Sequence, residues 1–104
     1  RVDCNQLTNL ANKKSACLVD VRPKSEFETG AIAGSVNIPF EELENRNDEL
    51  LKEKNNPIVL ICKMGRNAAL AGEKMQAYGY KETHVLHGGI STWQQEGLPL
   101  VKIK

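Results

Sequence analysis

Short apolar runs alternate along this chain with longer segments of mixed polarity. Four runs have the length and the content of β-branched residues that are typical of buried strands, and a shorter one stands at the start. They cover residues 1–2, 16–21, 36–38, 58–61 and 83–86. The segments between most of them are long enough for helices. The alternation predicts one α/β domain over residues 1–104, with a mostly parallel sheet covered on both faces by helices.

The first two helices are predicted from their end signals. Asp3 is a suitable N-cap for a helix that closes at residues 12–15. Pro23 suits a first helical turn, and residues 25–28 have the pattern of a capping box. Gly30 is expected to end that second, short helix.

Three further helices are predicted in the second half of the chain. One is expected over residues 41–51, with inward positions at Leu43, Leu50 and Leu51. The next follows the segment around Cys62 and ends near residues 78–80. The last opens at residues 88–89 and contains Trp93, which is expected to pack in the core.

Composition narrows the range of partners. The 104 residues carry a formal net charge of +1, with 40% hydrophobic and 26% charged residues. These values are ordinary for a globular protein and give no reason to expect a nucleic acid or an anionic membrane as partner. No apolar stretch reaches the roughly 18 residues that span a bilayer. We expect a cytoplasmic monomer; since the chain opens at Arg1 and not at methionine, a membrane tether in a preceding segment is the alternative.

Three cysteines stand far apart in the sequence, at positions 4, 17 and 62. Their odd number and the lack of a C-x-x-C pair argue against a disulfide framework and against a structural zinc site. Cys17 lies inside a predicted strand, where a small buried apolar residue is expected. His84 and His87 have no partner at ligand spacing, so no metal and no cofactor is predicted.

The segment around Cys62 carries the strongest chemical signal. Cys62 follows the apolar strand 58–61, and the glycine-bearing loop after it leads into a predicted helix. A helix N-terminus and the cations Lys63 and Arg66 would then surround the sulfur, and such surroundings lower the pKa of a cysteine thiol. A thiol of pKa about 8.5 is about 3% ionised at pH 7, and a drop of two units makes it roughly three-quarters thiolate. Cys62 is therefore the predicted nucleophile.

Four segments of the chain have a distinctive sequence pattern: residues 18–22 with 26–27, residues 30–39, residues 61–66, and residues 86–90 with Trp93 and residues 97–99. Together they resemble the rhodanese family of single-domain sulfurtransferases. In order, they are similar to the family's first signature, its G-H-I-x-G-A/S-x-N-I-P segment, its active-site loop and its closing L-x-G-G-x-x-x-W segment. The resemblance implies a three-layer α/β/α fold with a five-stranded, mainly parallel central sheet in the order 1-5-4-2-3.

The same resemblance implies a sulfurtransferase. Its thiolate, here Cys62, would take a sulfane sulfur from thiosulfate or a related anionic donor and pass it to cyanide or to a thiol acceptor. The substrate-binding residues would be those of the loop: Lys63, Met64, Gly65, Arg66, Asn67 and Ala68. A sulfur-relay protein is a further possible partner. Asp20 and Arg22 are candidates for a supporting role, although an ion pair of Arg22 with Glu26 or Glu28 and a turn organised by Asp20 explain them equally well.

The chain departs from the family pattern at two places. Position 31 is alanine where the family usually has a histidine of structural role. Arg66 stands one place earlier than in the frequent C-x-x-G-x-R-S loop, and Asn67 and Ala68 follow it. Because the arginine is shifted, the sequence does not predict which sulfur donor is preferred.

Three other functions remain as alternatives. Cysteine-loop phosphatases and arsenate reductases need an arginine six places after the cysteine to bind a tetrahedral oxyanion, and Ala68 occupies that place. The second is a non-enzymatic or regulatory module that carries a persulfide; members of the family without enzymatic activity include ones that have lost the cysteine, so the presence of Cys62 argues against it. A redox or persulfide sensor could use the same thiolate, but no resolving cysteine is nearby in the sequence.

Overall fold

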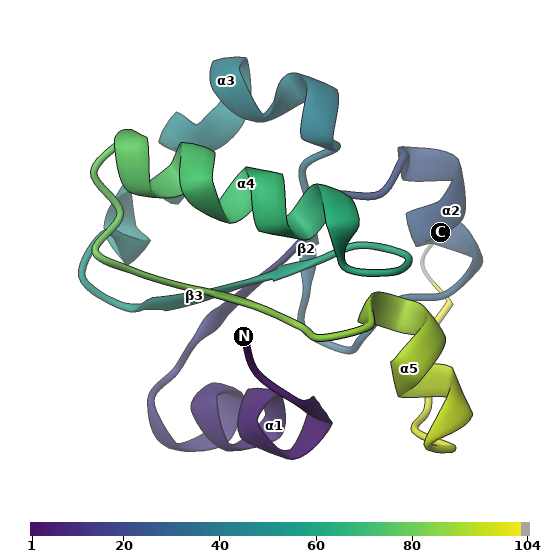
Figure 1. Ribbon diagram of the computed structural model, residues 1–104. Coiled ribbons are helices and arrows are strands. Elements are labelled where there is room, and N and C mark those ends of the chain that lie inside the picture. The colour runs from purple at the N-terminus through teal and green to yellow at the C-terminus, as the bar shows by residue number, and fades with distance from the viewer. Residues whose placement is uncertain (103–104) are drawn as a thin grey trace.

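The structure, a computed structural model, describes residues 1–102 and contains a four-stranded sheet with helices on both faces (Figure 1). All pairs of neighbouring strands are parallel, in the order β2-β1-β3-β4. The strands are β1 (Cys17–Asp20), β2 (Val36–Asn37), β3 (Pro57–Ile61) and β4 (Glu82–Val85). The predicted α/β fold with a parallel sheet is confirmed.

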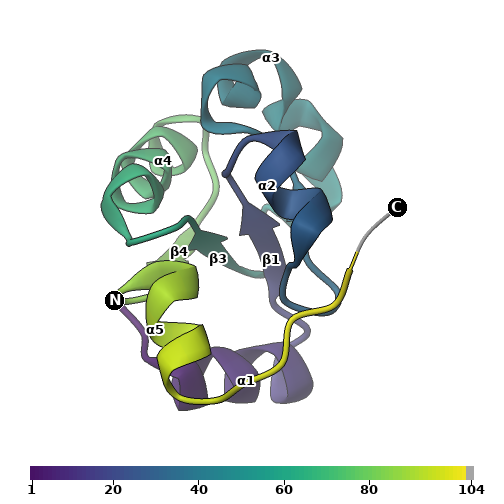
Figure 2. The same cartoon turned by 90° about the vertical axis from the view of Figure 1, so that its right-hand side faces the viewer.

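The helices form the two outer layers of the fold. They are α1 (Cys4–Lys13), α2 (Lys24–Thr29), α3 (Leu43–Arg46), α4 (Arg66–Ala77) and α5 (Gly89–Gln95), with 3-10 turns η1 (Phe40–Glu42) and η2 (Asn47–Glu53) on either side of α3. Figure 2 shows α2, α3 and α4 on one side of the sheet and α1 and α5 on the other. None of the helices in residues 1–102 is both long and apolar enough to cross a bilayer.

Two hydrophobic clusters fill the space between these layers. Strand β3 contributes to both, because successive side chains of a strand point to opposite faces. Ile58 and Leu60 pack with Met75 of α4, whereas Val59 and Ile61 pack with Trp93 of α5. All four of these β3 side chains are fully buried, as expected for a central strand between two helical layers. The core thus fixes the end of β3, where Cys62 follows.

The family resemblance implied five strands, and at the place of the first one the structure has a single bridged residue, Val2. Val2 forms an isolated parallel bridge with Leu86, and its N–H donates to the carbonyl of Val85 at 2.9 Å. Asp3 then starts α1 with a capping box shared with Gln6, so the extended conformation ends at Val2. The bridge lies beside β4, which is the place that the order 1-5-4-2-3 gives to the first strand. The five-strand detail itself is not confirmed.

Two local predictions were wrong. Helix α2 begins at Lys24 after Pro23 and has no side-chain cap, so residues 25–28 form no capping box. Residues 41–51 do not form one helix, because α3 gives way to 3-10 geometry and Leu50 has non-helical dihedral angles (φ −107°, ψ 15°). Leu43 and Leu50 are buried as predicted, but Leu51 is 55% exposed. At this break in the helix the Leu50 side chain packs in the core, whereas the Leu51 side chain is exposed.

Candidate active site

Cys62 lies directly after β3, at the carboxyl edge of the parallel sheet. In Figure 1 the loop that follows β3 turns back into α4 beside the start of α5. The residue is 5% exposed, and its Sγ accepts a hydrogen bond of 2.8 Å from the backbone N–H of Gly65. Ligand sites of open α/β sheets form at this edge. The sulfur is therefore placed and hydrogen-bonded by the loop itself.

The first turn of α4 adds further donors near the sulfur. Gly65 is the N-cap residue, and its φ of +96° is a left-handed conformation that favours glycine. It makes no side-chain cap, and the first helical hydrogen bond runs from the N–H of Ala69 to the carbonyl of Gly65. The N–H groups of residues 66–68 precede that bond, so they have no partner within the helix. A helix N-terminus of this kind attracts negative charge.

Helix α5 holds the loop from the other side. The N–H of Ile90 donates to the carbonyl of Cys62 at 2.9 Å, and that of Ser91 donates to the carbonyl of Lys63 at 3.0 Å. Gly89 makes this approach possible, since a Cβ atom there would lie 2.3 Å from the Cys62 carbonyl oxygen. Sequence reasoning recognised the glycine pair at 88–89 as a helix start but missed its contact with the loop.

A pocket of about 350 Å³ opens above Cys62. The loop and the start of α4 contribute Cys62, Lys63, Met64, Arg66 and Asn67 to its wall, so five of the seven predicted loop residues line one space. The opposite wall comes from the segment after β1 and from α2, with Val21, Arg22, Pro23 and Glu26.

The remaining two loop residues have other places. Gly65 is buried and contacts the sulfur through its backbone N–H, and Ala68 is fully buried in the core cluster that contains Met75. A methyl group in the core cannot bind an oxyanion, which agrees with the argument against a phosphatase loop. Lys63 and Arg66 are exposed, and within residues 1–102 neither forms an ion pair.

Asp20 and Arg22 form a buried ion pair beside this pocket. Arg22 Nη2 lies 2.8 Å from Asp20 Oδ2 and also donates to the carbonyl of Gly30 at 2.7 Å. The Arg22 backbone N–H donates to Asp20 Oδ1 at 2.9 Å, so Asp20 organises the turn after β1. The sequence predicted Glu26 or Glu28 as the ion-pair partner of Arg22, and this prediction was wrong. The pair fixes the segment that forms the second wall of the pocket.

The other two cysteines lie in surroundings that suppress their reactivity. Burial raises the pKa of the Cys17 thiol to about 11, with a further contribution from the charge of Glu53. Burial likewise raises the pKa of Cys4, and Glu96 adds to the rise. A thiolate is the reactive form, so both residues are expected to be inert near neutral pH.

We expect iodoacetamide at pH 8 to alkylate Cys62 and to leave Cys4 and Cys17 unmodified. A rise of the Cys17 pKa from 9.0 to about 11 reduces its thiolate fraction about 100-fold at that pH. Peptide mass spectrometry after timed quenching measures the three rates. Labelling of Cys17 should rise as the pH approaches 11 or when the protein is denatured, and equal labelling of all three thiols in the native protein would contradict the assignment.

Residues 1–102 contain no group of three or more His, Cys, Asp or Glu side chains that could hold an ion. His84 pairs with Glu82 at 2.8 Å on β4, and His87 is exposed in the loop before α5.

The structure is thus a parallel α/β domain with one cysteine, Cys62, at the carboxyl edge of its sheet, in a pocket whose wall carries both cations and the carboxylate of Glu26. The family model described as a rhodanese-like domain matches residues 3–96. The chain is therefore a member of the rhodanese-like family, which confirms the resemblance read from its four sequence segments.

Individual relatives agree with this assignment. A sulfurtransferase of Allochromatium vinosum is 30% identical, over 96% of this chain and 92% of its own length. The protein YibN of Escherichia coli K12 is 35% identical over 95% of this chain and 70% of its own. A crystal structure of a rhodanese-related protein from Thermoplasma volcanium superposes with a TM-score of 0.84 at 32% identity, covering 96% of this chain and 95% of that one.

Proposed function

We propose that this protein is a sulfurtransferase that carries a sulfane sulfur as a persulfide on Cys62. The observation that supports the proposal most directly is the placement of the Cys62 sulfur, which accepts the Gly65 N–H at 2.8 Å at the floor of a pocket with two exposed cations. The name of the Allochromatium vinosum relative points the same way.

In the first half-reaction the Cys62 thiolate attacks the outer sulfur of a donor such as thiosulfate. A bond forms between Sγ and that sulfur, the sulfur–sulfur bond of thiosulfate breaks, and its electron pair leaves with sulfite. Lys63 and Arg66 would attract the dianionic donor. The N–H groups at the start of α4 would stabilise the negative charge that the persulfide retains.

In the second half-reaction cyanide or a thiolate attacks the outer sulfur of the persulfide. The bond between Sγ and the outer sulfur breaks, and its electron pair returns to Sγ as the thiolate. The acceptor leaves as thiocyanate or as a persulfide, so no external oxidant or reductant is needed. Two half-reactions with a covalent intermediate predict ping-pong kinetics.

Intact mass spectrometry tests the proposal. After incubation with thiosulfate, the protein is expected to gain the mass of one sulfur atom and to lose it again on addition of cyanide. The Cys62→Ser variant should gain nothing, whereas Cys17→Ala, which removes a thiol outside the pocket, should gain the sulfur as the parent protein does. Absence of an adduct, together with hydrolysis of a phosphate ester, would favour the phosphatase alternative instead.

Arg66→Ala is expected to raise the KM for thiosulfate about threefold to tenfold, with a smaller effect on kcat. Arg66 is exposed at the rim of the pocket, so its contribution is an electrostatic attraction of the donor that added salt weakens. Steady-state kinetics at low and high ionic strength measure it.

The matched control is Lys74→Ala, which removes the same charge from the last turn of the same helix. Its KM should stay near that of the parent protein. If the KM for thiosulfate is unchanged in Arg66→Ala, Arg66 does not contribute to donor binding.

A further inference from the structure

A second pocket lies beside the one that contains Cys62. Its volume is about 240 Å³, and it shares Val21, Pro23 and Asn67 with the first pocket. These three residues form the border between the two spaces, so a small molecule in the second pocket can extend across it toward the sulfur. The donor chemistry proposed above uses only the first pocket.

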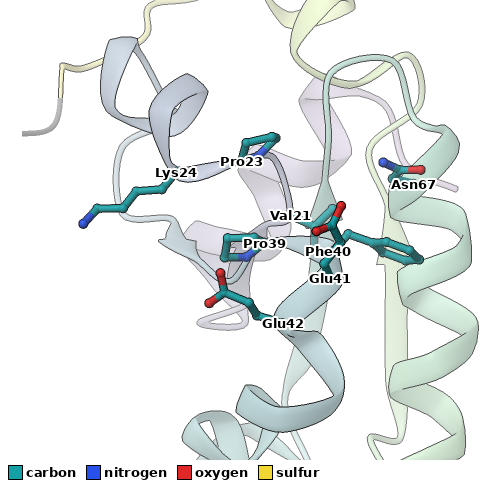
Figure 3. Close-up of a pocket in the computed structure, with 8 residues that line it drawn as sticks. All are labelled: Val21, Pro23, Lys24, Pro39, Phe40, Glu41, Glu42 and Asn67. Carbon is teal, nitrogen blue, oxygen red and sulfur yellow. The ribbon is translucent and has the colours of Figure 1, made fainter.

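The two pockets differ in charge. Lys63 and Arg66 line the first, together with Glu26 and with Arg22, whose charge is paired with Asp20. Glu41 and Glu42 line the second, together with Lys24, which is paired with Glu28. Figure 3 shows the Glu41 carboxylate directed into the space between the end of β1 and α4, on the same side as Asn67, while Lys24 extends away from it. Glu42 is already paired with Arg46 at 2.8 Å, but Glu41 forms no ion pair within residues 1–102. The open negative charge of this pocket is therefore that of Glu41.

The apolar part of the pocket wall includes an aromatic ring, which can contact a cation. The Phe40 ring lines the pocket next to Glu41, and Pro23 and Pro39 complete that side. An aromatic ring beside an unpaired carboxylate is a favourable site for an ammonium group, because the ring and the carboxylate both attract positive charge. The same carboxylate repels thiosulfate and sulfite. The unpaired Glu41 carboxylate therefore favours a positively charged molecule over an anionic donor in this pocket.

We propose that this second pocket binds the ammonium group of an aminothiol acceptor, with Glu41 as its counter-ion and Phe40 as its apolar wall. The proposal rests on the sulfur transfer proposed above and names its acceptor class. The acceptor thiolate attacks the outer sulfur of the Cys62 persulfide, the bond to Sγ breaks, and the acceptor leaves as an aminoalkyl persulfide while Sγ becomes a thiolate again. Asn67, at the border of the two pockets, lies along the path between the ammonium site and the sulfur.

The kinetic test compares amino- and hydroxyalkanethiols of equal and increasing chain length. Cys62 is first loaded with inorganic polysulfide, the excess is removed, and the loss of the extra sulfur is followed by intact mass. Each second-order rate constant is divided by the thiolate fraction of the acceptor at the working pH. At the best chain length, the amino compound is expected to react about fivefold faster than its hydroxy counterpart at low salt, a difference typical of one exposed ion pair.

Glu41→Gln is expected to abolish this difference, so that each amino compound and its hydroxy counterpart react at the same normalised rate. Glu44→Gln is the control, because Glu44 is an equally exposed carboxylate on α3 that does not line this pocket. An amino-to-hydroxy ratio that is the same in the parent protein and in Glu41→Gln would overturn the proposal.

A binding measurement separates this proposal from the sulfur transfer itself. Propylammonium, which carries no thiol, is titrated into the isotopically labelled protein while its amide resonances are recorded. Shifts at Phe40, Glu41 and Asn67 that disappear in Glu41→Gln support the ammonium site even if Cys62 does not load. Absence of these shifts in the parent protein overturns the site even if Cys62 loads normally.

Discussion

Replacing Gly89 with alanine is expected to lower the free energy of unfolding by about 3 kcal/mol and to abolish loading of Cys62. The new Cβ would lie 2.3 Å from the Cys62 carbonyl oxygen and 2.7 Å from the carbonyl carbon and oxygen of Lys63. All three are backbone atoms, so no side-chain rotation relieves the overlap. The loop must move away from α5 and lose the hydrogen bonds from Ile90 and Ser91, which displaces the sulfur from its donor at Gly65.

Gly97→Ala is the matched control for this substitution. Gly97 also has a positive φ, of 77°, but a Cβ there would have no heavy atom within 4 Å. Its cost is the backbone strain alone, about 1 kcal/mol. Denaturant titration gives the stabilities, and intact mass after thiosulfate gives the loading. If Gly89→Ala loads sulfur as well as Gly97→Ala does, the contact between α5 and the loop is not required for the site.

Asp20→Ala is expected to destabilise the protein by about 4 kcal/mol, because it leaves the Arg22 guanidinium buried without its counter-ion. Asp20 is fully buried and Arg22 is 7% exposed, so water cannot replace the lost partner at low cost. The segment after β1 should loosen as well, since the Asp20 carboxylate also accepts the backbone N–H of Arg22. Chemical denaturation measures the change.

The double variant Asp20→Leu/Arg22→Met distinguishes two contributions to stability. One is the cost of burying Arg22 without a counter-ion, and the other is the net contribution of the intact ion pair. Two apolar residues of similar size remove both charges, so most of the lost stability should return. Arg46→Ala provides a surface comparison. It removes the exposed pairs with Glu42 and Glu49, and it should change stability little. If Asp20→Ala lowered the free energy of unfolding as little as Arg46→Ala does, the buried ion pair would contribute no more to stability than an exposed one.

The sequence allowed the position of Cys62 to be predicted because its signals are local. An apolar strand, a cysteine, a glycine and a helix opening follow one another within a short segment, and each restricts the backbone by itself. The parallel sheet could be predicted for the same reason, from the repeated change between buried strands and helical segments. The structure confirms both the sheet and the loop at its carboxyl edge.

The features that were missed depend on contacts between distant segments or on burial. Nothing near Gly89 in the sequence indicates that it touches the Cys62 carbonyl. Arg22 was expected to pair with Glu26 or Glu28 of α2, but it pairs with the buried carboxylate of Asp20 at 2.8 Å. Residues 41–51 have a composition that favours a helix, yet Leu50 enters the core only where the helix is broken. In the last two cases tertiary packing overrode a local preference.

The two hydrogen bonds from α5 also determine which way the peptide groups of the cysteine loop face. A trans peptide places its N–H opposite its carbonyl, so fixing the carbonyls of Cys62 and Lys63 toward α5 directs the N–H groups of Lys63 and Met64 to the other side. The peptide dipoles of the loop are thus oriented when the chain folds, before any substrate binds. In the sulfur transfer proposed above, the free and the loaded forms should therefore share one loop conformation.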